Sequence, residues 1–314
     1  MSNVLVTGGA GFIGSNLAEA LVKEGHEVVV LDDFSLGSEK NLSSVLKQVK
    51  LVKGSILDKG LMLRLTKNTD FVFHEAAASA SPMFRDRLTE CVEVNVVGFV
   101  NVLKAAKENN VRRVIYASTS SLYGNNPPPL KEDMKVTPPN FYSVTKLANE
   151  HAALMFGQER DLETVGFRYM SVYGPREETK GEFANLASQF LWAMKKDGQP
   201  VIYGDGEQTR DFTYVKDVVK ANLLAMKSRK RLIGEVFNVG SGTGTSLNKL
   251  VELINILLGS KIKPKYVRTP VKNYIFTQLG DLTKIRRRLG YKPDYPLGRG
   301  LAEMVNEIGK NQNN

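Results

Sequence analysis

A run of glycines between a strand pattern and a helix pattern constrains this chain more than any other feature. Gly8, Gly11 and Gly14 follow the apolar segment Val4–Val6 and accompany the start of the amphipathic segment Ile13–Lys23. At such a junction, glycines permit a tight turn, a close approach of the backbone to a pyrophosphate, and close packing of the helix on the strand. The pattern predicts a dinucleotide-binding loop.

An acidic residue strengthens this prediction. Asp32 follows the second strand pattern, Glu27–Leu31, and lies eighteen residues after Gly14. A carboxylate there can accept hydrogen bonds from the ribose hydroxyls of an adenosine, and it would repel a 2′-phosphate. The alternative, in which Asp32 and Asp33 only begin a turn, does not explain the agreement of loop, strand and acid. The sequence therefore predicts NAD as the cofactor, in preference to NADP.

Strand and helix patterns alternate through the first half of the chain. Helical patterns cover Ile13–Lys23, Thr89–Glu108 and Ser143–Arg160. The predicted strands are Val4–Val6, Glu27–Leu31, Lys50–Val52, Asp70–Phe73, Arg113–Ala117 and Thr164–Phe167. This alternation is typical of an α/β fold in which a doubly wound, Rossmann-type parallel sheet is covered by helices on both faces. Ligands then bind at the carboxyl ends of the strands.

After Arg168 the alternation fades, and segments rich in Gly, Pro and charge separate shorter helices. We predict that residues 169–210, 235–274 and 291–314 form a smaller, discontinuous α/β substrate-binding lobe. Residues 1–168 form the NAD-binding domain, to which residues 211–234 and 275–290 return.

Charge and cysteine content exclude several classes of partner. The formal net charge is +10, but the basic residues are scattered and no base-reading motif accompanies them, so we expect no nucleic-acid partner. Cys91 is the only cysteine, which excludes an intrachain disulfide and a cysteine-based zinc site, and we expect no metal. The sequence has no signal-peptide pattern and no membrane-span pattern. We therefore expect no membrane partner and a cytoplasmic location.

Tyr142 and Lys146 form a Y-x-x-x-K step on a predicted helix. Residues four apart share one helix face, so the ammonium can lower the pKa of the phenol and make it a proton acceptor near neutrality. An isolated step of this kind is more often surface decoration. Here a strand pattern ending in Ser118 and Thr119 precedes it. The pair is therefore a candidate acid/base.

The chain resembles the extended short-chain dehydrogenase/reductase family through a series of segments that occur in the same order over nearly its whole length. Within that family it is similar to the NAD-dependent nucleotide-sugar 4-epimerases that act on UDP-glucose or UDP-N-acetylglucosamine. The matching segments are TGGAGFIGSNL at 7–17, LDDFSLG at 31–37, HEAAA at 74–78, VNVVG at 94–98, ASTSSLYG at 117–124, YSVTK at 142–146, FRYMSVYGPR at 167–176 and GDGEQTRDFTYVKDV at 204–218. The resemblance implies an isomerase of carbohydrate metabolism. It also implies a homodimer, in which Thr89–Glu108 and Ser143–Arg160 pack as four helices across a twofold axis.

The resemblance assigns catalytic roles to Tyr142, Lys146 and Thr119. Tyr142 would remove the proton of the sugar 4-hydroxyl, Lys146 would bind the nicotinamide ribose, and Thr119 would hold the sugar 4-oxygen. Hydride would pass from C4 to NAD and return to the opposite face after the 4-keto sugar turns. The implied cofactor-binding residues are Gly8, Gly11, Phe12, Ile13, Gly14, Asp32, Asp33, Ser35, Ser55, Ile56, Ala76, Ala77, Ala78, Asn95, Ser118, Tyr142, Lys146 and Tyr169.

A UDP-sugar site is implied in the same way. Arg210 matches an arginine that pairs with the substrate diphosphate, a contact suited to guanidinium geometry. Asn185 matches a second diphosphate or nucleotide contact, and Val201 and Tyr203 would flank the base. The full set is Ser120, Ser171, Asn185, Val201, Tyr203, Arg210 and Arg268, with Lys272 as an alternative to Arg268. Ser171 and Ser55 depart from the Asn and Asp common in relatives, which predicts shorter or water-mediated contacts.

Other reactions of the fold remain as alternatives. Ser120-Ser121 stands where 4,6-dehydratases need an Asp-Glu pair, and Ser121 where UDP-glucuronate decarboxylases usually carry a glutamate, which argues against both. The segment QLGDLTK at 278–284 resembles heptose 6-epimerases and keeps that class open. Gln278 is intermediate in size at a position where a bulky aromatic tends to exclude N-acetyl sugars, so we favour a dual or N-acetyl-preferring enzyme. A non-catalytic NAD sensor would have lost the base or the hydroxyl, and both are present.

Overall fold

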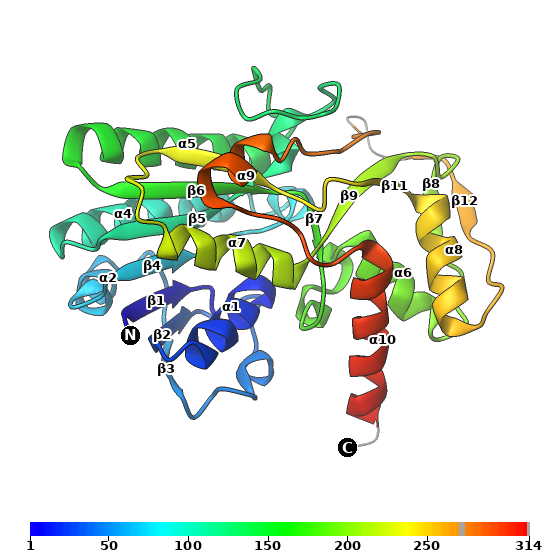
Figure 1. The fold of residues 1–314 in the computed structure, drawn as a ribbon, viewed down its shortest axis with the longest axis horizontal. Coiled ribbons are helices and arrows are strands. Elements are labelled where there is room, and N and C mark those ends of the chain that lie inside the picture. The colour runs from blue at the N-terminus through cyan, green and yellow to red at the C-terminus, as the bar shows by residue number, and fades with distance from the viewer. Residues whose placement is uncertain (270–273, 313–314) are drawn as a thin grey trace.

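Seven parallel strands form the centre of the protein in a computed structural model that describes residues 1–269 and 274–312. Their order is β10-β6-β5-β4-β1-β2-β3, and every neighbouring pair is parallel (Figure 1). The strands are β1 (Asn3–Thr7), β2 (Glu27–Asp32), β3 (Val49–Lys53), β4 (Phe71–His74), β5 (Arg113–Thr119), β6 (Glu163–Tyr169) and β10 (Glu235–Val239). The sheet confirms the predicted α/β fold, and the six strands expected from the sequence all occur.

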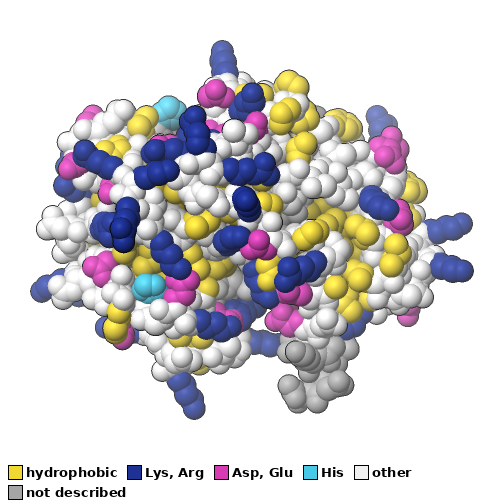
Figure 2. All heavy atoms as spheres, in the orientation of Figure 1, with side chains coloured by type: hydrophobic (Ala, Val, Ile, Leu, Met, Phe, Trp, Pro, Cys, Tyr) yellow, Lys and Arg dark blue, Asp and Glu magenta, His cyan; other side chains and the backbone are white. Residues whose placement is uncertain are grey.

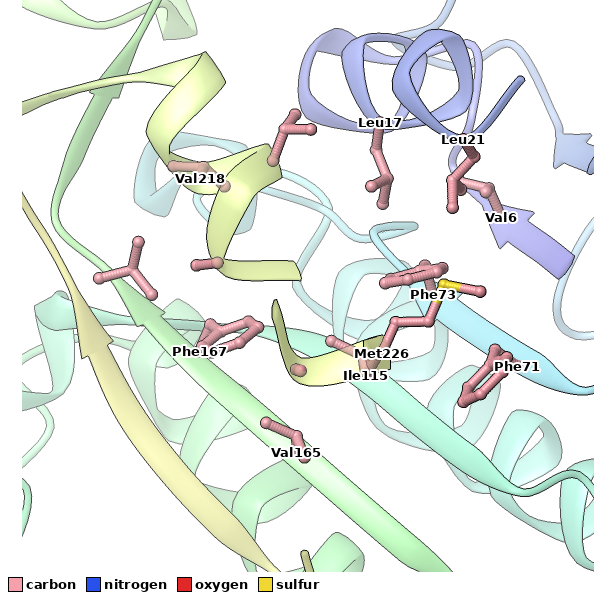
Figure 3. Close-up of a cluster of buried hydrophobic side chains, with 14 of the residues drawn as sticks. Val6, Leu17, Leu21, Phe71, Phe73, Ile115, Val165, Phe167, Val218 and Met226 are labelled. Carbon is pink, nitrogen blue, oxygen red and sulfur yellow. The ribbon is translucent and has the colours of Figure 1, made fainter. Parts of the chain in front are cut away.

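Helices cover both faces of this sheet. On one face, α1 (Phe12–Lys23), α7 (Val215–Lys227) and α9 (Thr283–Leu289) pack on a core that includes Leu17, Val218 and Ile285. Figure 3 shows side chains of α1 and α7 meeting those of the strands in this core. On the other face, α2 (Lys59–Thr66), α4 (Phe99–Glu108) and α5 (Phe141–Arg160) pack on a second core around Val72 and Tyr116. Burial on both faces explains why these strands are almost continuously apolar.

One predicted helix is interrupted. The expected helix Thr89–Glu108 consists of α3 (Leu88–Val92), a π-helical segment η3 (Glu93–Gly98) and α4. The π segment contains Asn95, whose buried amide bonds the backbone of Ala78 and the hydroxyl of Thr145. π-helical turns of this kind often occur at functional sites. Shorter 3-10 turns are η1 (Glu39–Leu42), η2 (Ser81–Phe84), η4 (Ser120–Tyr123) and η5 (Glu178–Phe183).

A second lobe lies beside the carboxyl edge of the large sheet (Figure 1). In a three-stranded sheet, β9 (Thr209–Tyr214) lies between β7 (Ser171–Tyr173) and antiparallel β11 (Gly244–Ser246), and β8 (Val201–Tyr203) pairs with β12 (Lys265–Val267). The helices α6 (Leu186–Met194), α8 (Leu247–Leu258) and α10 (Leu297–Gln312) pack around a third core. This lobe has the α/β composition expected for it.

Two segments lie on the other side of the domain boundaries predicted from the sequence. Residues 235–239, assigned to the lobe, form β10 and pair with β6, because Phe237 and Val239 are buried in the large core. Residues 211–214, assigned to the first domain, belong to β9 of the lobe sheet. Residues 270–273 and 313–314 of the predicted lobe lie outside the described residues. With these two changes, the division into two lobes remains a proposal.

The surface is strongly basic in total but mixed in distribution. Figure 2 shows Lys and Arg side chains interspersed with acidic and apolar side chains over the face that it displays. Across residues 1–269 and 274–312, no helix has both the length and the apolar character needed to span a membrane.

Candidate functional site

The glycine loop connects β1 to α1 at the carboxyl edge of the large sheet. Gly8 has φ +68°, and a Cβ there would come within 2.5 Å of the backbone nitrogen of Ala76. A Cβ on Gly14 would overlap the carbonyl oxygen of Gly8. The loop therefore requires glycine at both positions, and the first turn of α1 lines the cavity. These features fit a bound dinucleotide pyrophosphate.

Asp32 lies at the end of β2, beside this loop. Its two carboxylate oxygens accept hydrogen bonds from the backbone N–H groups of Ala10 and Phe34, both at 2.9 Å. Burial raises the pKa of Asp32 above its ordinary value, and the backbone donors oppose this. The backbone N–H of Gly11 is a third donor, and a carboxylate has about four acceptor positions, so the Asp32 carboxylate can still accept a ribose hydroxyl. Asp33, next along the chain, accepts from the backbone N–H of Ser35 at 2.9 Å.

The opposite wall of the cofactor site comes from the segment after β4. The Asn95 Oδ1 accepts from the backbone N–H of Ala78 at 2.8 Å, and its Nδ2 donates to Thr145 Oγ1 at 3.0 Å. Asn95 therefore ties the Ala76–Ala78 turn to α5. Asn95 does not line the cavity itself and contacts the Ala76–Ala78 wall through Ala78.

The candidate acid/base residues lie on α5, beside the end of β5. The Asn140 side chain caps α5 by accepting from the Ser143 N–H at 2.9 Å, which fixes the start of the helix at Phe141, one residue before Tyr142. Lys146 Nζ donates to the carbonyl oxygen of Ala117 at 2.9 Å. The Thr119 hydroxyl hydrogen-bonds Tyr142 and accepts from the Ser121 N–H at 3.1 Å. The predicted catalytic trio is thus brought together.

The electrostatics of this trio differ from the expectation that Lys146 makes Tyr142 a proton acceptor near neutrality. Burial raises the pKa of Tyr142 to about 12, although the Thr119 hydrogen bond lowers it, and the charge of Glu75 raises it further. Burial lowers the pKa of Lys146 to about 8, and Glu75 opposes this. In the protein alone, desolvation of the phenolate therefore outweighs the hydrogen bond from Thr119.

The cavity continues from the cofactor loop into the second lobe. Gln278 lies between the lobes, where its Nε2 donates to Ser120 Oγ at 2.7 Å and its Oε1 accepts from Ser171 Oγ at 3.0 Å. Arg210 is held by the carbonyl oxygens of Thr209 and Phe276 at 2.8 and 3.2 Å. Asn185 caps α6 through its Oδ1, at 2.9 Å from the Ala187 nitrogen.

Most of the residues predicted for the site line this one cavity, which has a volume of about 750 Å³. That size lies within the usual range of small-molecule sites. The predicted residues that line it are Gly8, Gly11, Phe12, Ile13, Gly14, Asp32, Asp33, Ser35, Ser55, Ile56, Ala76, Ala77, Ala78, Ser118, Thr119, Ser120, Tyr142, Lys146, Tyr169, Ser171, Asn185 and Arg210.

Three residues predicted to bind substrate do not line the cavity. Val201 and Tyr203 lie on β8 with exposed fractions of 47% and 38%, because β8 pairs with β12 at the outer edge of the lobe. Arg268 follows β12 and is exposed. The alternative cation, Lys272, lies outside the described residues.

Six charged residues of the cavity were not predicted from the sequence: Glu75, Asp86, Arg87, Glu90, Glu177 and Lys180. Glu75 lies directly after β4 and accepts a hydrogen bond from Tyr169 at 2.9 Å. Lys180 reaches in from η5, with its Nζ at 5.7 Å from the centroid of the Phe12 ring. The HEAAA segment offered a signal for Glu75, since the acid immediately precedes the wall residue Ala76.

Comparison with known proteins assigns the family. Residues 4–240 match the NAD dependent epimerase/dehydratase family. This chain belongs to that family. It is 36% identical over 306 residues to a UDP-glucose 4-epimerase of Mycolicibacterium smegmatis, with 96% of each chain covered. It is 34% identical over 316 residues to a UDP-N-acetyl-alpha-D-glucosaminuronate decarboxylase of Bacillus cytotoxicus, again with 96% of each chain covered.

A solved structure extends the similarity to three dimensions. The UDP-N-acetylglucosamine 4-epimerase of Methanobrevibacter ruminantium M1, in complex with UDP-N-acetylmuramic acid, aligns with a TM-score of 0.93 at 33% identity, and 99% of each chain is covered. The family membership confirms NAD as the cofactor. The protein is thus an NAD-dependent nucleotide-sugar epimerase/dehydratase.

Proposed function

We propose that this protein is an NAD-dependent 4-epimerase of UDP-hexoses, which interconverts UDP-glucose and UDP-galactose or their N-acetylated counterparts. The observation that carries the proposal is the meeting of Tyr142, Thr119 and Lys146 in one cavity with the glycine loop. A phenol beside a hydroxyl is suited to remove and return one proton at a single sugar oxygen.

The chain's own residues divide the chemistry among them. Thr119 holds the sugar 4-oxygen, and Tyr142 accepts its proton and later returns it. Lys146 adds positive charge that favours the phenolate, whose pKa of about 12 in the protein alone must fall when the site is filled. NAD, when bound, supplies the acceptor for the C4 hydride. Arg210 holds the diphosphate, so that the hexose can turn while the nucleotide stays bound.

The residues beyond Thr119 favour epimerisation over its rivals. Ser120 has a neutral hydroxyl that accepts a hydrogen bond from Gln278, and Ser121 is neutral as well. Dehydration needs an acid and a base at neighbouring sugar carbons, and neither serine supplies one. The similarity to a decarboxylase makes loss of a sugar carboxylate the second candidate reaction.

Gln278 supports acceptance of N-acetyl sugars. Hydrogen bonds to Ser120 and Ser171 hold its amide across the junction of the two lobes. An amide held in this way leaves more room than an aromatic ring would, and it offers polar atoms to an acetamido group.

The test is direct assay of the purified protein with UDP-glucose, UDP-N-acetylglucosamine and UDP-glucuronic acid, with products separated by chromatography. We expect C4 epimers of the first two, and a loss of activity on the order of 100-fold or more in Tyr142→Phe. Release of CO2, formation of a 4-keto-6-deoxy sugar, or no product with any sugar would each overturn the proposal.

We also propose a homodimer through α3, η3, α4 and α5. Val97 and Val144 are 46% and 49% exposed, and Met155 is 40% exposed, so these helices carry apolar side chains on the surface. Such side chains are typical of a covered interface. Sedimentation of the wild type as a dimer, and of Val97→Asp/Val144→Asp as a monomer, is the expected result; a monomeric wild type at micromolar concentration would refute it.

A further inference from the structure

A carboxyl group with no assigned role lies in the cavity beside the acid/base residues. Glu75 follows β4 directly, and the preceding residue, His74, is in register with Tyr116 of β5. The next residue of β5 is Ala117, whose carbonyl oxygen accepts from Lys146 Nζ. Glu75 and the Lys146 ammonium therefore lie at the carboxyl ends of two adjacent strands.

Hydrogen bonds fix where the Glu75 carboxyl lies. Tyr169, at the end of β6, donates its phenolic proton to Glu75 Oε1 at 2.9 Å. Asn222 of α7 donates to the same Tyr169 oxygen at 2.9 Å. These hydrogen bonds hold the carboxyl at the cavity wall, on the side of the sheet covered by α7. Neither Tyr169 nor Asn222 supplies a positive charge to pair with it.

Lys146 is buried and Glu75 is half-buried, and burial ordinarily demands an oppositely charged partner for such groups. Within the described residues, no ion pair shorter than 4.0 Å involves either Lys146 or Glu75. Lys146 is only 2% exposed, and its ammonium donates a hydrogen bond to a neutral carbonyl oxygen. Unpaired charges are costly to bury, so two opposite charges that face one cavity interact with each other and with any charge placed between them.

We propose that Glu75 is a charge-tuning residue that biases the bound cofactor toward its oxidised form, NAD⁺. The nicotinamide ring carries a positive charge in NAD⁺ and none in NADH. A carboxylate in the same poorly solvated cavity attracts the oxidised ring and loses that attraction when hydride is accepted. An enzyme that must recover NAD⁺ in every turnover benefits from this bias, because NADH left in the site would prevent oxidation of the next substrate molecule.

The groups around Glu75 make its charge dependent on pH near neutrality. Burial raises its pKa to about 7, while the Tyr169 hydrogen bond and the Lys146 charge act in the opposite direction. Tyr142 on α5 also faces it and, in the protein alone, stays protonated, since its pKa there is about 12. His74 stays neutral, because burial and Lys146 lower its pKa to about 3. The bias is therefore present above about pH 7 and lost below it.

This inference rests on NAD binding and not on the choice of sugar. Its test needs no substrate: the protein is loaded with cofactor and equilibrated with a redox dye couple, and the ratio of bound NADH to NAD⁺ is read from absorbance at pH 8 and pH 6. A failure of the epimerase proposal would leave this measurement unaffected.

The decisive comparison is between wild type and Glu75→Gln. At pH 8 we expect the NADH:NAD⁺ ratio to be about fivefold higher in the variant, because loss of the carboxylate favours NADH. Part of this effect is offset because Glu75 also raises the pKa of Lys146, so that Lys146 carries less positive charge in the variant. At pH 6, where Glu75 is protonated, the two proteins should agree. Equal ratios at pH 8, or the same difference at both pH values, would overturn the proposal.

Two further variants separate charge from structure. Glu75→Asp keeps the negative charge and shortens the reach to Tyr169, so its ratio at pH 8 should stay near that of the wild type. Glu90→Gln removes a carboxylate that lies at the rim of the same cavity but is 60% exposed, and we expect no change in the ratio. If Glu75→Asp gives the same NADH:NAD⁺ ratio as Glu75→Gln, the shape of the side chain and not its charge sets the reduction potential of the bound cofactor, and the proposal is wrong.

Discussion

Single buried charges dominate the candidate site at the scale of residues. Lys146 and Asp32 are buried and Glu75 is half-buried, and their pKa values move in the direction that burial imposes on each. Tyr142 follows the same rule, which is why its pKa is raised in the protein alone. An ionised Tyr142 near neutral pH therefore requires that cofactor and substrate occupy the site.

The raised pKa of Glu75 predicts a pH-dependent cost in stability. Its folded-state pKa of about 7 lies above the ordinary 4.5, so the folded protein binds more protons between these values, and stability falls as pH rises through that window. Glu75→Gln removes this cost. Its free energy of unfolding relative to wild type should rise by on the order of 3 kcal/mol from pH 4.5 to 7.5.

Denaturant unfolding of the cofactor-free proteins at a series of pH values measures this difference. If the free energies of unfolding of wild type and variant differ by the same amount at every pH in the window, the pKa of Glu75 is not raised in the folded protein.

The glycine loop gives a second prediction for single residues. In Gly14→Ala the new methyl would overlap the Gly8 carbonyl oxygen, so we expect NAD binding to weaken by at least tenfold or the fold to be lost. Gly298→Ala is the matched control, because nothing lies within 4 Å of a Cβ there and the residue is in α10. It should leave NAD affinity unchanged and add up to about 1 kcal/mol of stability. Calorimetric titration with NAD distinguishes the two.

At the scale of elements, a buried ion pair joins β6 to the two elements that carry the candidate catalytic residues, α5 and β5. Glu150 of α5 accepts two hydrogen bonds from Arg168 of β6, at 2.9 and 2.7 Å, and one from Ser118 of β5 at 2.5 Å. Arg168 also stacks on Tyr123, with its guanidinium carbon 4.9 Å from the ring centroid. This network sets the distance between α5 and the end of β5.

Removing the carboxylate should loosen all three elements. Glu150→Ala leaves a buried guanidinium without its anion, and we expect a loss of about 3–5 kcal/mol in the free energy of unfolding. Glu90→Ala, which breaks an exposed pair with Arg87, should cost less than about 1 kcal/mol. If chemical denaturation gives the two variants equal stability, the network does not anchor the site.

Much of the site was predictable because motifs fix residues relative to strand ends. Gly8, Asp32, Thr119 and Lys146 each follow or face a strand pattern in the sequence, and all of them line one cavity. Contacts between distant segments were not predictable. Gln278 bonds Ser120 across 158 positions in sequence, and no local pattern indicates which side chain it meets.

The elements show the same limit. The strand β10 was missed because its five residues include the buried polar Asn238, which interrupts an apolar pattern. The interrupted helix before β5 was predicted as continuous because its apolar spacing runs through the π segment. The placement of Val201 and Tyr203 at the cavity stays unsupported, since pairing of β8 with β12 could not be read from the sequence.

At the scale of the whole molecule, Asp211 connects the two lobes. It is fully buried on β9 and accepts from the backbone N–H groups of Ser241, Gly242 and Gly280, at 2.7, 3.2 and 3.3 Å. Gly280 lies two residues after Gln278, so the same carboxylate fixes the segment that crosses the cavity. The placement of the Gln278–Gly280 segment against β9 depends on it.

Asp211→Asn tests this connection. An amide placed against several N–H donors leaves at least one unsatisfied, so we expect a loss of about 1–3 kcal/mol in stability. UDP affinity should fall several-fold, while NAD affinity changes less, because Asp211 is remote from the glycine loop in the chain. Titration of both ligands provides the check, and an equal loss for both would argue against a connection specific to the substrate half.

The central claim is that hydride leaves C4 of a UDP-hexose and returns to the same carbon. The most direct measurement is incubation of the purified protein with UDP-N-acetylglucosamine and UDP-glucose deuterated at C4, in ordinary water, with the products analysed by NMR and mass spectrometry. We predict C4 epimers that retain the deuterium at C4, and no reaction in Tyr142→Phe. Deuterium at C6, loss of deuterium to solvent, or absence of an epimer would contradict the account.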